Sequence, residues 1–525
     1  MSQALITALQ DADCYDHPVA SVEILETHVS WIVLTGDYAY KLKKPLAFGS
    51  FLDFSTLDKR RHFCEQEVRL NRRLAPSLYL EAVPISGSLD SPRINDASTP
   101  FEYAVKMRHF SNRHLFSTLQ AGGELSLELL DDLIDQLVMF HEQAERAPEE
   151  SELGTRESMQ RSIEHELALI APRLEDEQDR QQLTFLQTWA EEALERFDSE
   201  FKRRRREGYV RETHGEVHLG NAVDHQGRAS MFDGIEFNDE LRWNDVGGDL
   251  AFLLMDLEAR GEEGLAHHAL NRYLELSGDH SLVRLLPFYK FYRALVRAKV
   301  AILRYHQPQL HSSDRSAVMA TYRQHIELAA RYAEFDFPYL LIGVGVSGSG
   351  KSRFTAEVVC KLGNVRLRSD VERKRLFGFE PEADSAQQAM DIYTGETTTQ
   401  TYAQLARLTG ILLEAGRPVC IDATCLKREQ RDLLRHQAEG RGLPVLLISF
   451  EADEATLRQR IEKRARRSGD PSEAGLAVLE HQLDEFEPFD DDERRHLIHL
   501  DTTAKDANLR LVELIQEQLR LERKG

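Results

Sequence analysis

The stretch YLLIGVGVSGSGKS, residues 339–352, decides the fold of the C-terminal part of the chain. Its apolar start is typical of a buried strand, and the run RFTAEVVCKL that follows is typical of a helix. The glycines between them allow backbone amides to wrap around phosphate groups, and the final Lys-Ser pair supplies a cation and a magnesium ligand. A tight turn would require the glycines but not the Lys-Ser pair. The segment therefore predicts a phosphate-binding loop (P-loop).

Each position of this loop receives a predicted role. Lys351 is expected to reach the outer phosphates of a nucleotide, which also makes it a catalytic candidate, and Ser352 is expected to coordinate Mg2+. The other residues expected to bind the nucleotide are Gly345, Ser347, Gly348, Ser349 and Gly350.

Short apolar runs alternate with helical stretches on both sides of this loop. The runs are YLLIGVGV, NVRLR, PVCIDA, PVLLISF and HLIHLD. Such alternation is typical of an α/β fold with a parallel sheet covered by helices on both faces. A proline in the segment 335–338 stops the preceding helical pattern. We therefore expect an α/β P-loop NTPase domain over residues 337–525.

Charged residues follow the strand ends of the predicted sheet. Asp370 comes directly after the second strand and is placed to take a proton from an attacking hydroxyl group, and Arg373 could hold substrate or phosphate as a second catalytic residue. Asp422 ends another strand and suits a water-mediated contact with Mg2+. These residues indicate a small kinase and not a motor ATPase.

Arginines recur along the run LRQRIEKRARRSGD. Arg460, Arg464 and Arg467 have the spacing i, i+4 and i+7, which places them on one face of a helix. A basic helix face is ordinarily solvated. Beside a P-loop it fits better a lid, with Arg460 on the nucleotide and the other two as catalytic residues over the transferring phosphate.

The segments RSDVERKRLFG and IDATCLKREQR and the arginine-rich helix resemble a family of P-loop kinases. This family includes polynucleotide 5′-hydroxyl kinases, zeta-type toxins, chloramphenicol phosphotransferase and gluconate kinase. The resemblance covers about residues 338–520. It implies ATP-dependent phosphorylation of a hydroxyl group and leaves the acceptor open. A nucleic-acid acceptor is expected, if anywhere, only at this domain.

A second loop, HGEVHLGN at residues 214–221, has the spacing of the kinase catalytic loop H-R-D-x-x-x-x-N. Glu216 stands where that loop has its catalytic aspartate. Asn221 is expected to hold a magnesium ion, and Asp233, at the end of the next strand, to hold the metal that bridges the phosphates.

The lysine that such a site requires has two candidates. Lys41 is favoured because it ends the strand-like run YAYK, as the lysine of V-A-I-K does in kinases. Lys43 lies on the same strand face and is the rival. Glu67, on the following helix, is expected to pair with the lysine, with Glu65 as the alternative. The loop THVS at 27–30 offers hydroxyls and amides to the phosphates in place of a glycine-rich loop.

The order of elements around this loop indicates two lobes. Residues 20–44 read as three strands, 56–74 as a helix, and FEYAVKM as a further strand, whereas about 125–206 and 247–334 read as mainly helical. The run FKRRRRE at 201–207 is typical of a solvated helix end, with a phosphate-steering patch as the alternative. We expect a small lobe over about 1–107 and a helical lobe over about 108–336.

YKLKKP, LDFSTLDKRRHFCEQEVRLNRRL and FDGIEFNDELRWNDVGGDLAFLLMDL resemble the aminoglycoside phosphotransferase-like kinases, in particular the bacterial branch fused to an ATP-binding domain. The match covers about residues 20–305. It implies an α+β protein-kinase-like bilobal fold over 1–336 that uses ATP and Mg2+, and it implies that Asp249 anchors the catalytic segment. The family motif is HGD, so Glu216 departs from it by one methylene.

Composition is that of a water-soluble protein, with 42% hydrophobic and 29% charged residues among 525. The net charge is −22, and residues 337–525 contribute only −4, with 28 Lys and Arg against 32 Asp and Glu. The remaining −18 should repel nucleic acid from the first part and attract cations. Five cysteines without a C-x-x-C pair, no signal peptide and no membrane-length apolar run favour the cytoplasm without a membrane partner.

Together these features predict a bifunctional ATP-dependent kinase whose two domains each transfer a phosphoryl group to a hydroxyl acceptor. Two alternatives stay open. In one, only the P-loop domain is catalytic and the first domain is a degenerate nucleotide-binding regulator. In the other, the chain is a nucleotide-gated module of the toxin–antitoxin kind.

Overall fold

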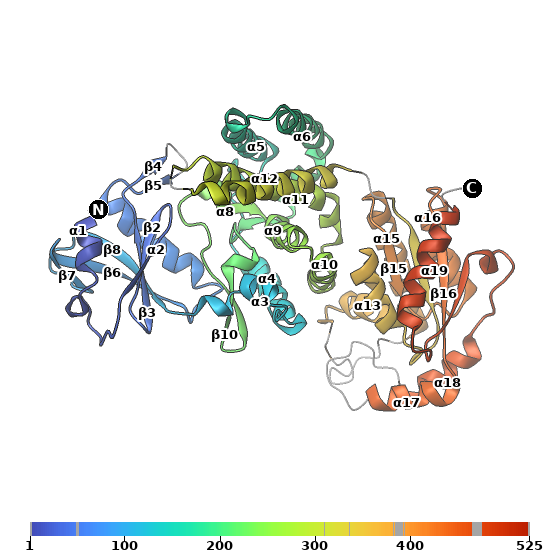
Figure 1. The fold of residues 1–525 in the computed structure, drawn as a ribbon. Helices are drawn as coiled ribbons and strands as arrows, with labels where there is room; N and C mark the ends of the chain where they lie inside the picture. The colour runs from blue at the N-terminus through green and yellow to red at the C-terminus, as the bar shows by residue number, and fades with distance from the viewer. Residues whose placement is uncertain are drawn as a thin grey trace. The chain divides into compact units, whose positions relative to one another are not determined.

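The structure, a computed structural model, describes residues 3–48, 52–308, 310–334, 337–381, 383, 392, 394–464 and 475–522. The chain forms two compact units (Figure 1). The first comprises residues 1–256 and 288–329, and the second comprises residues 257–287 and 330–525.

The small lobe of the first unit is a six-stranded antiparallel sheet in the order β1-β2-β3-β8-β6-β7. Helix α2 (Leu57–Asn71) packs against β6 and β8, and the Thr56 side chain caps its first turn. The strands are β1 (Glu23–Glu26), β2 (Ser30–Leu34), β3 (Tyr38–Lys43), β6 (Tyr79–Ser88), β7 (Ser91–Ile94) and β8 (Glu102–Arg108), with helix α1 (Gln3–Ala8) and the short pair β4 (Ala47–Phe48) and β5 (Leu52–Asp53) beside them. The predicted strands and helix are confirmed, whereas β6 and β7 were not predicted because Pro84 and Gly87 interrupt their pattern.

The rest of the first unit is mainly helical, as predicted. Its helices are α3 (Phe116–Ala121), α4 (Leu127–Gln143), α5 (Arg156–Ile170), α6 (Glu177–Arg196), α7 (Asp198–Arg206), α8 (Asp239–Arg242), α9 (Val246–Ala259), α11 (Leu286–Tyr305) and α12 (Ser312–Ala333). Two short antiparallel pairs, β10 (Ala222–His225) with β11 (Arg228–Met231) and β9 (Val210–Glu212) with β12 (Trp243–Asp245), frame the segment 214–221. The kinase-like bilobal plan is thus present.

The basic run at 201–207 is not simply a solvated helix end. Arg204 is fully buried, and its guanidinium contacts both carboxylate oxygens of Asp245, at 2.6 and 2.9 Å. Arg205 contacts backbone carbonyls of the segment 148–153 instead of solvent alone. The expectation was therefore wrong for these two arginines, because a run of like residues on a helix places some of them toward the interior.

The second unit is an α/β unit with five parallel strands in the order β14-β15-β13-β16-β17. Every strand matches one of the five predicted apolar runs: β13 (Leu340–Val344), β14 (Val365–Arg368), β15 (Val419–Asp422), β16 (Val445–Glu451) and β17 (Leu497–Asp501). The helices are α13 (Lys351–Leu362), α14 (Ser369–Leu376), α15 (Gly395–Glu414), α16 (Arg428–Glu439), α17 (Glu454–Arg464), α18 (Leu476–Glu485) and α19 (Ala507–Glu522). The P-loop NTPase fold is confirmed.

One helix of the second unit comes from an earlier part of the chain. Helix α10 (Glu263–Ser277) packs against α13, and Asn271 donates to the Asn364 carbonyl and accepts from the Arg366 amide, at 3.1 and 2.7 Å. The sequence pattern predicts this stretch as part of the helical lobe of the first domain, where its apolar periodicity fits equally well. Across the described parts of the chain, no helix is both long and apolar enough to cross a membrane.

Candidate functional site

The P-loop follows β13 and leads into α13. Gly348 and Gly350 have positive φ angles of 82° and 97°, in the region where glycine is favoured. A Cβ atom on Gly348 would also lie 2.9 Å from the Leu457 carbonyl oxygen, so this position tolerates no side chain. The Lys351 ammonium folds back onto the carbonyls of Gly345 and Val346, at 2.7 and 3.0 Å. A bound phosphate would replace these carbonyls as the partner of the Lys351 ammonium.

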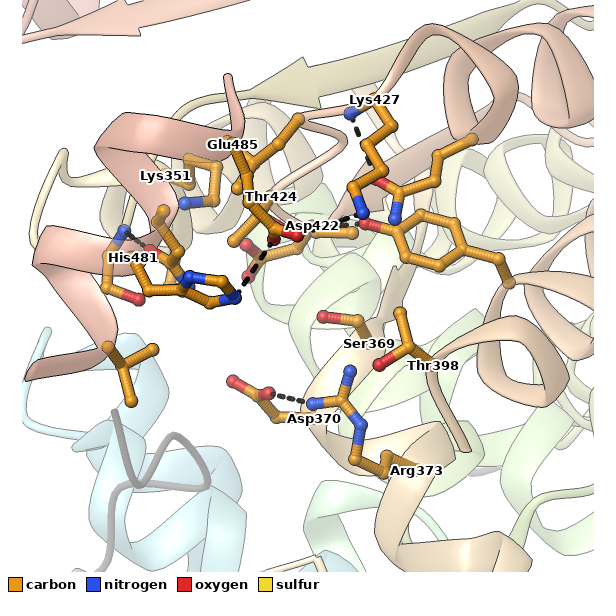
Figure 2. Close-up of a pocket in the computed structure, with 18 of the residues that line it drawn as sticks. Lys351, Ser369, Asp370, Arg373, Thr398, Asp422, Thr424, Lys427, His481 and Glu485 are labelled. Atoms are coloured by element: carbon orange, nitrogen blue, oxygen red, sulfur yellow. Dashed lines mark hydrogen bonds and ion pairs between the residues drawn. The ribbon is translucent and has the colours of Figure 1, made fainter. Parts of the chain in front are cut away.

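A pocket of about 840 Å³ opens over this loop (Figure 2). Asp370 and Arg373 come from α14 and form an ion pair of 3.2 Å, and they face Lys351 and His481 across the pocket. The other predicted residues in its lining are Ser347, Gly348, Gly350, Ser352, Asp422 and Arg460. The volume lies within the range that small-molecule ligands occupy.

The residues predicted to hold Mg2+ offer suitable oxygen ligands. Asp422 is buried at the end of β15, and its Oδ2 atom accepts no hydrogen bond from any described residue. Arg368, its neighbour on β14, lies 3.6 Å from that oxygen and is itself held by Glu275 at 2.9 Å. Ser352 is exposed to the pocket. Carboxylate and hydroxyl oxygens beside a phosphate site fit Mg2+, which prefers few protein ligands.

The lid arginines are placed only in part. Arg460 lies in α17, and its guanidinium contacts the P-loop carbonyls of Gly348 and Ser349, both at 3.3 Å, and Thr502 at 2.9 Å. It therefore braces the loop from behind as well as lining the pocket. Arg464 is the last residue of α17, but its side chain lies outside the described residues. The whole of Arg467 lies outside them.

Two features of this site were not predicted. Gln482 of α18 accepts a 2.7 Å hydrogen bond from the Ser347 amide, so α18 is tied to the P-loop. Glutamine in a charged helix carries no sequence pattern that would reveal this contact.

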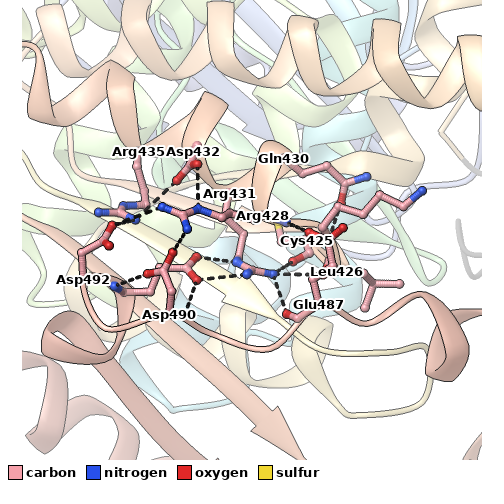
Figure 3. A network of polar contacts seen from close by, with 12 residues as sticks. Cys425, Leu426, Arg428, Gln430, Arg431, Asp432, Arg435, Glu487, Asp490 and Asp492 are labelled. Atoms are coloured by element: carbon pink, nitrogen blue, oxygen red, sulfur yellow. Dashed lines mark hydrogen bonds and ion pairs between the residues drawn. The ribbon is translucent and has the colours of Figure 1, made fainter.

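The other is a network around Arg431 (Figure 3). Arg431 and Glu493 are both fully buried and meet at 2.5 and 3.0 Å, while Arg431 also donates to the carbonyls of Cys425 and Leu426. The network fixes the segment that follows Asp422. Arg431 is the last residue of the run IDATCLKREQR, but no role was predicted for it.

The first unit brings together the predicted lysine, glutamate and aspartate. The Lys41 ammonium lies 2.8 Å from Glu67 and 2.5 Å from Asp233. The rival Lys43 contacts the other oxygen of Glu67 at 2.6 Å and also Glu236, so one buried carboxylate serves both lysines. Lys41 is the lysine that reaches Asp233. Glu65, the alternative to Glu67, instead pairs on the surface with Arg61.

Asp249 anchors the predicted catalytic loop, as the family resemblance implies. The two carboxylate oxygens of Asp249 accept from the amides of His214 and Gly215, at 2.9 and 2.8 Å. Asn221 is buried, and its side chain donates to the Glu216 carbonyl at 3.1 Å, which closes the loop on itself. Asp233 has a φ of 61°, and its amide donates to the Tyr79 hydroxyl. The loop and Asp233 are therefore held by contacts from several elements.

The two carboxylates of this site differ in pKa. Burial raises the pKa of Glu216 to about 7, and the negative charge of Asp233 adds to the shift. Burial also acts to raise the pKa of Asp233, but the ammonium of Lys41 outweighs it and lowers that pKa below its ordinary value. A carboxyl group with a pKa near neutrality beside a carboxylate that stays ionised is typical of acid–base sites.

Comparison with known proteins gives one family match and several relatives. Residues 340–489 match the family model of an AAA domain, which covers the P-loop and four of the five parallel strands. Uncharacterized proteins of Mycobacterium tuberculosis and Mycobacterium bovis are each 27% identical over 484 residues, which is 90% of this chain and 93% of theirs. The relatives thus have both parts together.

Among solved structures, the chain is similar to the amicoumacin kinase hAmiN in complex with AMP-PNP, Ca2+ and Ami, with 14% identity, a TM-score of 0.40 and coverage of 63% of this chain and 94% of that chain. It is also similar to a gluconokinase from Sinorhizobium meliloti 1021, with 22% identity, a TM-score of 0.24 and coverage of 36% and 94%.

Proposed function

We propose that the chain is a bifunctional ATP-dependent phosphotransferase with a kinase-like domain over 1–336 and a P-loop kinase domain over 337–525. Each domain transfers the γ-phosphoryl group of ATP to a hydroxyl acceptor. The observation that carries the proposal is the pocket in which the P-loop, Lys351, Asp370 and Asp422 meet. A motor ATPase has no need of a carboxylate and an arginine facing the phosphate site from α14.

In the second domain, the loop amides and Lys351 would bind the phosphates of ATP. Asp370 would accept the proton of the acceptor hydroxyl, and its partner Arg373 would hold the acceptor or the transferring phosphate. Ser352 and Asp422 would hold Mg2+, which neutralises charge on the phosphates. Gln482 would keep α18 over the loop.

In the first domain, Lys41 would bind nucleotide phosphates while Glu67 orients it, and Asn221 and Asp233 would hold Mg2+. Glu216 would take the proton of the attacking hydroxyl. Its carboxylate has an environment that suits a base near neutral pH, which supports a working enzyme. The rival function is a nucleotide-binding regulator, favoured by the glutamate in place of aspartate.

The five cysteines are all free, and four are buried, which supports a reducing compartment such as the cytoplasm.

Nucleotide stoichiometry tests the two-site proposal. Calorimetric titration with AMP-PNP and Mg2+ should give two sites per chain in the parent and one in Lys351→Ala. The matched control is Lys361→Ala, at the exposed end of the same helix, which should keep two. A single site in the parent would overturn the proposal.

A further inference from the structure

Helix α11 presents two arginines to the catalytic loop of the first domain. Arg293 donates from Nε to the Gly248 carbonyl at 3.1 Å, and the next residue, Asp249, holds the loop amides before Glu216. Arg297 lies one helical turn further on the same face. The positive charges of both arginines act on the Glu216 carboxyl, against the effect of its burial. Both arginines therefore lie near the predicted base.

Neither arginine has a carboxylate partner within the part of the chain that the structure describes. Arg293 is 3% exposed, its Nη2 atom has no hydrogen-bond partner there, and its guanidinium lies over the rings of Phe252 and Tyr292, at 5.0 and 5.4 Å. Arg297 is half-buried and forms no ion pair or hydrogen bond with any described residue. By contrast, Lys299 on the same helix pairs with Glu166 at 2.9 Å.

A buried guanidinium with a donor that has no hydrogen-bond partner is costly to keep. Arg293 therefore calls for a ligand or a structural reason, even though its charge acts on the carboxylates of Glu216 and Asp249. Acidic residues that could pair with the two arginines are plentiful, because residues 1–336 have a net charge of −18. At physiological ionic strength, solvent-exposed charges further apart than roughly 8 Å are largely screened from each other. The two arginines thus add positive charge next to the predicted base that the net charge of the whole domain does not reveal.

We propose that the first site phosphorylates an anionic alcohol, one that carries a phosphate or carboxylate group, and that Arg293 and Arg297 bind this group. The inference rests on the proposed function of the first domain. It differs from the attraction of cations that the net charge of residues 1–336 suggests.

The transfer balances without a further reactant. The acceptor oxygen forms a bond to the γ-phosphorus, the bond from that phosphorus to the β–γ bridging oxygen breaks, and ADP leaves with the electron pair. The hydroxyl proton passes to Glu216. The arginines bond to the remote anionic group of the acceptor and take no proton.

The test uses the full chain with Lys351→Ala, so that transfer from radiolabelled ATP reports the first site. Acceptors are offered in matched sets that share a hydroxyl scaffold and differ only in charge: glycerol 3-phosphate, glycerol and 3-amino-1,2-propanediol, with hydroxy acids, sugar phosphates and aminoglycosides as further members. Only anionic members should accept phosphate. Arg297→Gln should lower kcat/KM for them by about 10- to 100-fold, as for a lost hydrogen bond to a charged group.

A matched control is Arg304→Gln, at an exposed position of α11, which should leave transfer unchanged. Arg293→Lys keeps the charge but not the planar fork and serves if larger changes at this buried position unfold the protein. Transfer to cationic or neutral members, or to no anionic member while AMP-PNP still binds the first site, would overturn the inference.

The arginines could instead hold the phosphates of ATP. Arg297→Gln would then weaken AMP-PNP binding to the first site as much as it lowers transfer, and that result would also overturn the inference. If the parent fails to bind AMP-PNP at the first site at all, the proposed function of that domain fails before the acceptor is in question.

Discussion

Lys41 and Asp233 lie 2.5 Å apart, from ammonium nitrogen to carboxylate oxygen, although 192 residues separate them in the chain. The contact joins the end of β3 in the small lobe to the segment after β11 in the helical lobe. The two residues are the predicted phosphate ligand and the predicted metal ligand of one site. A bound nucleotide and its metal would replace Lys41 and Asp233 as each other's partners. Until they bind, this ion pair holds the two lobes in register, with both residues at the nucleotide site.

Glu67 should be essential for this register. Glu67→Gln leaves Lys41 and Lys43 with one carboxylate fewer in a buried setting, and we expect a loss of about 3 kcal/mol in the free energy of unfolding. Glu65→Gln, two residues earlier on the same helix, removes only an exposed pair and should cost less than about 0.5 kcal/mol. Urea unfolding of both variants measures the difference, and equal losses would contradict the role of Glu67.

Glu216 should act as the base of the first site. Because a base works only when ionised, transfer should rise with pH with a midpoint at about 7, or lower once Mg2+ offsets the charge of Asp233. Glu216→Gln should abolish most transfer, and Glu216→Asp should raise it by restoring the usual reach of the carboxylate. A clearly slower Glu216→Asp would mean that the loop has adapted to the longer side chain. Equal inactivity of all three proteins would indicate a regulator.

Much of the fold follows from sequence patterns that are local. The five parallel strands and the P-loop were predicted because each is a short apolar run with a clear boundary. The contacts that could not be predicted are those between distant segments. Arg204 in the basic run, Gln482 on the P-loop amide and α10 against α13 all depend on which face of a helix meets which neighbour.

The two sites also differ in what the sequence revealed. The P-loop residues follow one another in the chain, so a motif identifies them. In the first site, Lys41 and Lys43 share a strand face, so the sequence favoured Lys41 by its place in YAYK and left Lys43 as its rival. The choice depends on which lysine reaches Asp233, a long-range contact. Arg293 and Arg297 resemble ordinary helix arginines until their lack of carboxylate partners within the described residues is seen.

Asp370 should contribute to transfer more than to nucleotide binding. A base acts in the transition state, so Asp370→Asn should lower kcat for transfer by roughly 100-fold or more while the Kd for ATP changes little. The control is Glu357→Gln on α13, because Glu357 lies outside the pocket lining. Glu372 is nearer to Asp370 in the chain but is unsuitable because it is buried. Losses of equal size in kcat and in ATP affinity would make Asp370 a nucleotide or metal ligand instead.

Arg431 should stabilise both the fold and the second site. Arg431→Gln leaves Glu493 buried without its counter-charge, and we expect a loss of about 3–5 kcal/mol in unfolding free energy. The freed carbonyls of Cys425 and Leu426 should also loosen the segment after Asp422 and slow ATP turnover at the second site. Arg428→Gln, an exposed position on the same helix, should change stability by less than about 1 kcal/mol. Similar stability of the two variants would contradict this account.

The most direct test of two working sites is ADP formation by the full chain when each site is silenced in turn. Asp233→Asn removes the predicted metal ligand of the first site, and Lys351→Ala removes the phosphate-binding lysine of the second. With saturating ATP and Mg2+, each single variant should retain the turnover of the other site, and the double variant should fall to background. Complete loss of turnover in Lys351→Ala alone would contradict the account and leave the first domain as a nucleotide-binding regulator.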